Sequence, residues 1–501
     1  MNQSKRSFLT IKNLPPLSWS FLIIITSASI LIFSRLGRDY LRDYDECIYA
    51  QYAKEMQLSR HFLTYRWNGE RIFEKPPLFG WFMQLPYIFG VNEFTARISS
   101  VILGIILLIF IYFFTKKYFS DIIALAAVLV LLGSKFFFQN LITVNTDIGF
   151  TLFTFLGFYS FIISKKRKKF SYISGLFFGL AAMTKGLNVI LFLCAILFTF
   201  VFNRNKEIIK NYLNLVVAFL IIITPWHLYQ IVFHGKEFVQ VYFVDNLLIR
   251  TIYSIFPKES IFFYGDILIN DLLPWNLFVI LIIIIFSFHF IKKRTLINFS
   301  SCKPDDFKII LLYVLSFVLI PLILLSLVKT RLDLYLSPLY PYIAILIAYS
   351  IGLTFKLFKK EKLVYLIILL LIVNSFVTII NETDFFRGER KVSLSNEIFL
   401  VIKNYNVDRI EYLVESYYRS LWRNPPVVKY IPAQFAYGQK PCVLFYSEKR
   451  VNLYYYENEF QNRVNIKKKG LFLINKSDDW VVKNLPIKLL YQNDAYLLFE
   501  N

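Results

Sequence analysis

RISSVILGIILLIFIYFFT, at residues 97–115, is an apolar run long enough to cross a lipid bilayer as a helix. A hydrocarbon layer about 30 Å thick requires about 20 apolar residues in helical conformation, and this run is rich in Ile, Leu and Phe. A transmembrane β-strand would instead alternate apolar and polar residues. The run therefore predicts a membrane-spanning helix.

Apolar runs of similar length recur along the 501-residue chain, whose side chains are 56% hydrophobic. A water-soluble core cannot bury that much apolar surface, so lipid must surround much of the chain. We expect an all-α polytopic membrane domain of about 11 to 13 transmembrane helices. Spans are predicted near residues 17–34, 97–115, 121–138, 147–164, 171–184, 187–203, 213–231, 274–291, 308–327, 336–354 and 363–380. The first is interpreted as an uncleaved anchor, because no small-residue cleavage site follows it.

Basic residues flank these runs on one side of the predicted membrane. They lie before the first span and at residues 116–117, 165–169, 204–210, 292–294 and 356–362. Because short loops rich in Lys and Arg stay cytoplasmic, we expect a cytoplasmic N-terminus, and an odd number of spans places the C-terminus outside. The net charge of +22 and the sequence KKRKK could suggest nucleic acid. Since KKRKK lies between two apolar runs, we interpret it as an anchor against anionic lipid and expect no nucleic-acid partner.

Three polar regions fall on the outer side: the loops at 35–96 and 232–273, and the tail at 381–501. The tail contains the runs IEYLV, CVLFYS, VNLYYY, GLFLIN and AYLLF, which are typical of strands. A stretch from Ser395 to Tyr405 has apolar residues on one side and predicts a helix. We therefore expect a transmembrane domain at 1–380 and a small extracytoplasmic α/β domain at 381–501.

The first outer loop carries two clusters of charged residues. RDYDECIYAQYAKEM places Asp45 and Glu46 just beyond a span, and a solvated helix start is the alternative reading, because acidic residues favour that position. WNGERIFEKPPLFGWF places Glu74 and Lys75 before two prolines that cannot continue a helix. A lysine there can hold a phosphate as a point charge. The alternative is a lysine that reaches towards lipid headgroups.

Three consecutive motifs of this region, DYDECIYAQYAKEM, WNGERIFEKPPLFGWF and FGVNEFTARISSVILG, resemble the signature of the bacterial aminoarabinose lipid A transferases and their protein O-mannosyltransferase relatives. The resemblance is close from Arg38 to Gly104. It extends more weakly to about residue 345 through TVNTDIGFTLF, AMTKGL, PWHLYQIVFHGKEF and RLDLYLSPLYP. These families have the GT-C fold, and the resemblance implies the same fold here.

The resemblance also implies roles for the first loop. Asp45 corresponds to the family's essential acidic residue, and Lys75 to a residue that binds the lipid phosphate. Glu74 falls where a metal ligand can lie, and Glu46 is a second candidate for a metal-binding or orienting role. A carboxylate at Asp45 can accept the proton of an acceptor hydroxyl or orient the acceptor while phosphate is displaced with inversion. The anionic leaving group needs positive charge beside it.

Two charged residues lie at predicted span ends. The family carries an Asp comparable to Asp147, which implies a catalytic or orienting role; the alternative is a helix cap, which Asn145 or Thr146 could also provide. Lys185 divides a long apolar run next to Gly186, where a charge within lipid would cost about 2.5–3.5 kcal/mol. We expect a break between spans there and leave open a contact of Lys185 with a phosphate or headgroup.

The second outer loop contains VYFVDNLLIRTI, which matches a stretch that in relatives contributes a phosphate-binding Arg and sometimes a metal-binding His. Arg250 suits the phosphate role, and Asp245 is a further metal-binding or orienting candidate. No His occupies the metal position, so no cofactor is assigned and a divalent metal stays open. His227 and His234 lie nearby and are interpreted as interfacial polar residues.

KTRLDLYLSPLYP places Lys329, Arg331 and Tyr335 at the outer end of a span, and Tyr340 can join them. The resemblance implies that this segment faces the phosphate of the lipid donor. The alternative is an ordinary belt of basic and aromatic residues at the membrane interface.

The four cysteines show no metal-binding spacing and are interpreted as structural or incidental. Cys194 lies in a predicted span and Cys302 in an inner loop. Cys47 and Cys442 both fall on the outer side, so a disulfide between them is left open.

We therefore predict an inverting glycosyltransferase of the bacterial inner membrane with a periplasmic C-terminal domain. The resemblance implies that it moves a sugar from a polyprenyl phosphate, namely undecaprenyl phosphate, to lipid A, a protein hydroxyl or another cell-envelope acceptor. No G-x-G-x-x-G sequence indicates a nucleotide-sugar donor. A transporter or flippase of lipid-linked sugars is the main alternative, although the predicted spans carry few charges. A second alternative is a membrane-anchored binding or sensor protein whose function lies in the C-terminal domain.

Overall fold

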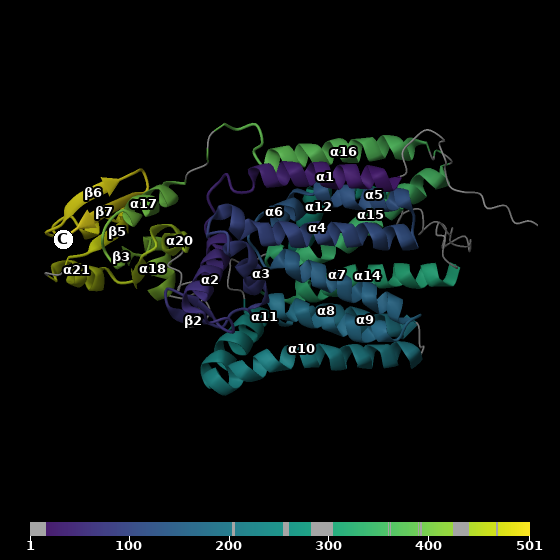
Figure 1. Ribbon diagram of the computed structural model, residues 1–501, viewed down its shortest axis with the longest axis horizontal. Helices are drawn as coiled ribbons and strands as arrows, with labels where there is room; N and C mark the ends of the chain where they lie inside the picture. The colour runs from purple at the N-terminus through teal and green to yellow at the C-terminus, as the bar shows by residue number, and fades with distance from the viewer. Residues whose placement is uncertain are drawn as a thin grey trace, which may run out of the picture.

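The computed structural model describes residues 17–202, 206–253, 260–281, 304–358, 360, 362–388, 390, 393–423, 440–466 and 469–501. Figure 1 shows long helices that run side by side, with a sheet-containing domain at one end of them. Helix α2 (Asp45–Ser59) and the strand β2 (Glu70–Ile72) lie between the helices and that domain.

Seven helical segments in the described part of the chain are long and apolar enough to cross a membrane. They belong to α1 (Leu17–Arg35), α4 (Glu93–Tyr118), α7 (Asp147–Ser164), α10 (Lys206–Phe238), α14 (Pro304–Leu327), η3 with α15 (Asp333–Leu339 and Tyr340–Leu357) and α16 (Leu363–Glu382). In α4, Asn92 and Thr95 form a reciprocal cap at the start, and Lys116 and Lys117 lie in the last turn. The predicted all-α polytopic membrane domain is confirmed.

Three predicted spans differ from the observed helices. The one at 121–138 is a pair, α5 (Asp121–Gly133) and α6 (Lys135–Ile142), bent by 75° and counted as an eighth span at most. Ser134 lies at the bend, where its side chain caps α6 and donates to Asp271. The other two correspond to α8 (Lys169–Lys185, 17 residues) and α9 (Ile190–Phe202, 13 residues), which are separated by η1 (Leu187–Val189) and are not among the seven segments. Most of the predicted span at 274–291 and Cys302 lie outside the described residues.

The region predicted as the second outer loop, 232–273, is largely helical in its described part. Helix α10 runs on to Phe238 and is followed by the π-helix η2 (Val239–Ile249), by α11 (Arg250–Ile252) and, further on, by α12 (Phe263–Leu272). At Gly235 the backbone has φ 48° and ψ −122°, so two helical pieces meet there at a kink. The helical content does not decide on which side of the membrane this region lies, so its place as an outer region stays a prediction.

The first outer loop has structure of its own. Helix α2 is followed by a hairpin of β1 (Tyr65–Trp67) and β2, and then by α3 (Leu78–Tyr87). Asn68 and Gly69 form the turn with φ of 58° and 86°, which these residue types tolerate. Glu55 ties the turn to α2, because its carboxylate accepts the N–H groups of Asn68 and Gly69 at 2.7 and 3.0 Å.

The C-terminal domain contains a five-stranded mixed sheet of order β4-β3-β5-β7-β6. Strand β3 (Arg409–Leu413) pairs in parallel with β4 (Arg450–Tyr454) and β5 (Leu471–Asn475). Strand β7 (Tyr496–Glu500) pairs antiparallel with β5 and β6 (Lys488–Gln492). The accompanying helices are α17 (Leu394–Lys403), α18 (Ser416–Arg423), α20 (Cys442–Ser447), α21 (Glu457–Asn465) and η4 (Lys476–Val481). This sheet with its helices confirms the predicted small α/β domain.

One of the predicted strands is wrong. CVLFYS, at 442–447, forms helix α20, and every residue of it is buried. A short apolar run cannot distinguish a buried helix from a buried strand by its pattern, and Pro441 directly before it provides the fixed φ that suits a helix start. Helix α20 packs against α17 and α2, outside the sheet.

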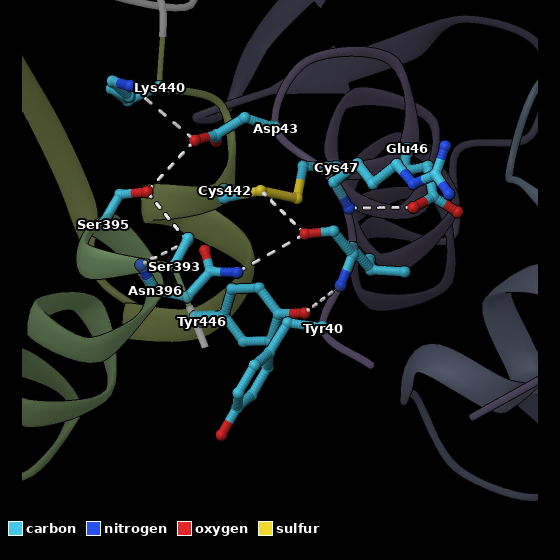
Figure 2. Close-up of a disulfide and its surroundings, with 12 residues drawn as sticks. Tyr40, Asp43, Glu46, Cys47, Ser393, Ser395, Asn396, Lys440, Cys442 and Tyr446 are labelled. Carbon is cyan, nitrogen blue, oxygen red and sulfur yellow. Dashed lines mark hydrogen bonds and ion pairs between the residues drawn. A yellow bond between two sulfur atoms is a disulfide. The ribbon is translucent and has the colours of Figure 1, made fainter. Parts of the chain in front are cut away.

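A disulfide between Cys47 and Cys442 fastens the C-terminal domain to α2 (Figure 2). Both residues are fully buried. Beside the disulfide, the Tyr446 hydroxyl accepts the Leu41 N–H at 2.7 Å, and the Asn396 amide donates to the Leu41 carbonyl at 3.4 Å. The sequence had left this pairing open, and it joins residues 395 positions apart.

Polar contacts also join the first outer loop to the C-terminal domain. The Asn68 side chain donates to the Val451 carbonyl at 2.6 Å and accepts the Val451 N–H at 3.0 Å. Lys54 of α2 forms an ion pair with Glu448 at 3.6 Å. The disulfide, the Asn68 hydrogen bonds and the Lys54 ion pair therefore hold α2 and the hairpin of the first outer loop against the C-terminal domain.

Removing the disulfide is expected to loosen this junction. In a Cys47→Ala/Cys442→Ala variant, we expect the free energy of unfolding to fall by about 2–4 kcal/mol, because the unfolded chain loses a covalent constraint. Thermal unfolding in detergent and limited proteolysis between the two domains measure the change. Cys194→Ala, which removes the free cysteine of α9, is the control. Equal stability and protease resistance of the double variant and the wild type would contradict the expectation.

Candidate active site

Asp45 begins α2 directly after a residue with an unusual backbone conformation. Tyr44 has φ 80° and ψ −115°, a region that residues other than glycine rarely adopt. On the other side of Tyr44, Asp43 turns to the C-terminal domain, where it contacts Ser395 at 3.2 Å and Lys440 at 3.8 Å (Figure 2). The strained turn thus separates Asp45 from its neighbouring carboxylate.

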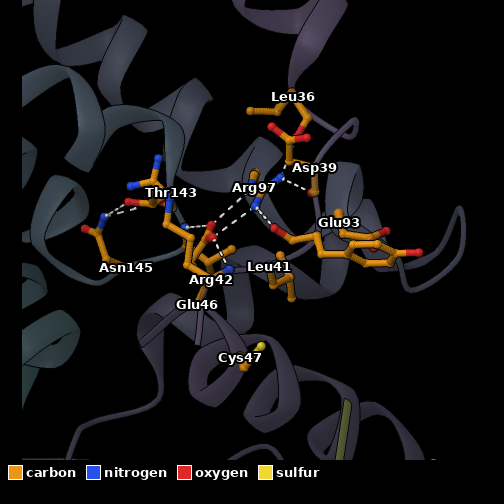
Figure 3. A network of polar contacts seen from close by, with 12 residues as sticks. Leu36, Asp39, Leu41, Arg42, Glu46, Cys47, Glu93, Arg97, Thr143 and Asn145 are labelled. Carbon is orange, nitrogen blue, oxygen red and sulfur yellow. Dashed lines mark hydrogen bonds and ion pairs between the residues drawn. The ribbon is translucent and has the colours of Figure 1, made fainter. Parts of the chain in front are cut away.

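Glu46 is held in a buried network at the junction of several segments (Figure 3). Its two oxygens accept the Arg97 guanidinium at 2.9 Å each, and the N–H groups of Arg42 at 2.8 Å and Val144 at 2.9 Å. The remaining donors of Arg97 bind the carbonyl groups of Leu36, Asp39 and Tyr40. These four bonds occupy the lone pairs of the carboxylate. Of the two roles predicted for Glu46, only the orienting role therefore stays as a prediction.

Asp147 and Lys185 form a buried ion pair between the adjacent ends of α7 and α8. Their side chains are 4% and 8% exposed. The cap of α7 is Asn145, whose side-chain oxygen accepts the N–H groups of Asp147 at 2.9 Å and Ile148 at 3.2 Å. The Asp147 carboxylate is thus not used as a cap and is available to Lys185. The Lys185 ammonium also lies 5.3 Å from the ring centre of Tyr335.

Glu74 and Lys75, in the segment between β2 and α3, complete the cluster together with Arg250. Lys75 lies within electrostatic reach of Arg250, Glu74, Lys185 and Asp147. The Arg250 guanidinium lies close to the Tyr335 hydroxyl and to Glu74. One oxygen of Glu74 is buried and has no hydrogen-bond partner among the described residues. The structure therefore brings together the following predicted residues: Asp45, Asp147, Glu74, Lys75, Arg250 and Tyr335.

The surroundings raise the pKa of Asp45 and lower the pKa of Lys75. Burial, together with the nearby Asp147 carboxylate, raises the pKa of Asp45 to about 6, against the opposing effect of Lys185 and Lys75. Burial and the neighbouring Arg250 cation lower the pKa of Lys75 to about 8. Both groups are charged at neutral pH, and each can lose its charge within a short pH interval.

The pH dependence of catalysis should show both groups. Asp45 must be ionised to accept a proton, so kcat/KM is expected to fall as the pH drops through about 6. Lys75 must be protonated to hold an anion, so kcat/KM is expected to fall as the pH rises through about 8. In Lys75→Arg the alkaline limb should disappear, because guanidinium stays protonated. An alkaline limb that is identical in the wild type and Lys75→Arg would refute the assignment to Lys75.

Three other predicted residues make contacts with residues outside this cluster. The Lys329 side chain is exposed, and its N–H donates to the Thr251 carbonyl at 3.1 Å. Arg331 donates to the Ser326 carbonyl at 2.8 Å. Asp245, inside η2, accepts the Gln240 amide at 3.0 Å. Their predicted roles at the donor phosphate or at a metal stay predictions.

No metal-binding group of three or more His, Cys, Asp or Glu side chains occurs among the described residues. His227 hydrogen-bonds the Ile223 carbonyl and the Tyr242 hydroxyl. His234 packs against the ring of Phe73. The contacts described for both histidines are with residues outside the charged cluster.

The sequence analysis missed two tyrosines of the site. Tyr44 lies beside Asp45 and Glu74, and Tyr49 lies beside Asp45 and Asp147. The spacing of Asp45 and Tyr49 on a helix, four residues apart, places both on one face and could have indicated Tyr49. The role of Tyr44 depends on its backbone conformation, for which the sequence has no signal.

Two cavities lie next to the start of α2, and Asp45 lines one of them. We call the inner cavity the space of about 240 Å³ that is lined by Asp45 and Glu46, by the loop after α6 and by Asp333 of η3. The outer cavity, about 300 Å³, lies between the ends of α1 and α16 and the start of the C-terminal domain at Ser393 and Asn396. Arg42, Asp43 and Thr143 line both cavities.

Comparisons with known proteins agree with this architecture. The profile of the dolichyl-phosphate-mannose-protein mannosyltransferase family matches residues 74–229. An undecaprenyl phosphate-alpha-4-amino-4-deoxy-L-arabinose arabinosyl transferase of Wigglesworthia glossinidia brevipalpis is 27% identical over 352 residues, which cover 67% of this chain and 59% of that relative. The crystal structure of ArnT from Cupriavidus metallidurans bound to undecaprenyl phosphate has a TM-score of 0.73 at 15% identity, and the match covers 97% of this chain and 98% of that one.

With its bundle of apolar helices and the charged cluster at one end, the chain is a multi-pass membrane glycosyltransferase of the GT-C fold. Within that class it is similar to the aminoarabinose transferases, over two thirds of its sequence and over nearly all of its fold.

Proposed function

We propose that this glycosyltransferase moves a sugar from a polyprenyl phosphate carrier to lipid A. The observation that carries the proposal is the approach of Lys75 to Asp45, with Arg250 next to Lys75: a carboxylate with a pKa of about 6 lies near cations suited to a phosphate. The name of the Wigglesworthia relative and the undecaprenyl phosphate in the Cupriavidus structure support this donor. No relative or structure reported above is a flippase.

The proposed reaction is a single displacement. The acceptor oxygen attacks the anomeric carbon, its proton passes to Asp45, and the bond between that carbon and the phosphate oxygen of the carrier breaks with inversion. Lys75 and Arg250 stabilise the negative charge that grows on the departing phosphate, since cations fixed in a buried site act more strongly than in water. Tyr335 lies beside Arg250 and is placed to orient its guanidinium.

The surrounding charges keep these groups in place. Lys185 pairs with Asp147 and holds that carboxylate in place, so Asp45 is the carboxylate left to accept the proton. Glu74 offers an oxygen without a described partner, which suits a hydroxyl of the transferred sugar. Lys329 and Arg331 remain candidates for a contact with the carrier at the membrane interface.

The proposed location is a bacterial inner membrane. The N-terminus would be cytoplasmic, the transmembrane domain would end near residue 380, and the C-terminal domain that follows would be periplasmic. The positive charge of the short loops supports this orientation. The first outer loop and the C-terminal domain lie at the same end of the helices (Figure 1), so the site and that domain would face the same compartment.

Transfer by the purified protein tests the proposal. The full chain in detergent is mixed with undecaprenyl-phosphate-linked aminoarabinose and lipid A, and mass spectrometry measures the added sugar. We expect the mass of lipid A to increase by one sugar. A flippase makes no covalent product, and an unchanged donor with every acceptor would overturn the proposed function. A protein hydroxyl is the second acceptor class, favoured by the mannosyltransferase profile, and sugar found on a Ser/Thr peptide instead of lipid A would select it.

A further inference from the structure

We infer that the inner and outer cavities form one passage for the acceptor, in which Arg42 binds a phosphate group of that acceptor. The inference rests on the proposed function and names a recognition element on the acceptor side of the same site. Arg42 is not one of the residues gathered around Asp45 and Lys75. Its backbone N–H donates to the Glu46 carboxylate, and its side chain is not part of that contact.

The position of Arg42 is the first observation. Arg42, Asp43 and Thr143 line both cavities, so they stand where one cavity leads to the other. Figure 3 shows Arg42 beside Thr143, next to the buried Glu46 network. Because Glu46 fixes the Arg42 N–H at 2.8 Å, the backbone at this junction is held in place while the side chain is exposed.

The charge of Arg42 is the second observation. Its guanidinium has no hydrogen bond or ion pair with any residue that the structure describes, whereas three acidic residues that line the cavities have partners of their own. Asp39 pairs with Arg387 at 2.9 Å, and Glu382 accepts Gln139 at 2.7 Å. Asp43 contacts Lys440 at 3.8 Å. An exposed planar fork of N–H donors at a cavity junction matches a phosphate, which it can bind through two hydrogen bonds.

The third observation is that Arg42 and the cations next to Asp45 occupy different places. Lys75, Arg250 and Lys185 act on Asp45 or on each other but line neither cavity, whereas Arg42 lines both. A displacement with inversion needs the acceptor and the leaving phosphate on opposite sides of the anomeric carbon. Separate cations therefore serve the two anionic substrates: Lys75 and Arg250 serve the donor, and Arg42 serves the acceptor.

Kinetics of two variants test the inference. In Arg42→Ala we expect KM for lipid A to rise about tenfold to a hundredfold, from the loss of a hydrogen-bonded charge, with KM for the undecaprenyl-phosphate donor within about twofold of the wild type. Arg42→Lys keeps the charge without the fork and should lie between the two. The wild-type KM for lipid A should rise with salt more steeply than that of Arg42→Ala. Arg409→Ala, an exposed arginine of β3 outside both cavities, is the control and should behave as the wild type.

Binding separates this inference from the proposed function. Vesicles that contain lipid A are sedimented with the wild type or with Arg42→Ala, and the experiment is repeated with dephosphorylated lipid A. The inference is supported if Arg42→Ala binds lipid A more weakly than the wild type does, and both proteins bind dephosphorylated lipid A equally. This result would stand even if no sugar transfer is found and the proposed function fails. Equal binding and an equal KM for lipid A in both proteins overturn the inference, and so does a loss confined to donor binding, while transfer itself can still stand.

Discussion

Asp45→Asn is expected to lower kcat for sugar transfer by about 10²- to 10⁴-fold, the range in which a positioned general base contributes. Asparagine keeps the size of the side chain but cannot accept the proton of the acceptor. The neighbouring Asp147 cannot readily replace it, because its carboxylate is buried and paired with Lys185. Steady-state transfer to lipid A measures the loss, with donor binding measured separately to show that Lys75 and Arg250 still hold the phosphate.

Asp43→Asn is the matched comparison, because it makes the same chemical change two residues away. Asp43 faces Ser395 and Lys440 of the C-terminal domain, and the turn at Tyr44 keeps it apart from the charged cluster. We expect less than a tenfold loss for it, on the scale of a partly exposed ion pair. Similar losses in the two variants would show that loop structure, and not the chemistry of Asp45, limits the rate.

The fold class was predictable because its signals are local. Long apolar runs specify spanning helices without reference to the rest of the chain, and the run at 97–115 lies within α4. Short segments were less certain, since CVLFYS is a helix and Gly235 marks a kink inside a helical region. In both cases the pattern is compatible with two structures, and tertiary packing decides between them.

The candidate site was predictable only where motifs carry it. Asp45 and Lys75 lie in ordered motifs of one loop, and they do approach each other. The partners that fix the site come from distant positions: Lys185 lies 38 residues from Asp147, and Cys442 lies 395 residues from Cys47. Nothing in local sequence pairs such residues, so the role of Lys185 as the partner of Asp147 and the disulfide both required the structure.

The Glu46–Arg97 pair leads to the second large effect, on stability. Glu46→Gln is expected to lower the free energy of unfolding by about 3–5 kcal/mol, because it leaves the Arg97 guanidinium buried without its counter-charge. Although burial alone favours the neutral acid, Arg97 lowers the pKa of Glu46, so the native pair is ionised. Chemical unfolding in detergent, followed by tryptophan fluorescence, measures the difference, and unchanged stability of Glu46→Gln would contradict the expected effect.

A double variant distinguishes a lost pair from a lost shape. Glu46→Gln/Arg97→Met removes both charges, so no buried ion is left unpaired, and its destabilisation should be smaller than the sum of the two single variants. Additive losses would mean that each side chain acts alone, through the carbonyl groups of Leu36, Asp39 and Tyr40 or the N–H groups of Arg42 and Val144. Because Val144 precedes Asp147 by three residues and Glu46 follows Asp45 directly, a true coupling would show that the charged pair stabilises the junction between the segments that carry the two carboxylates.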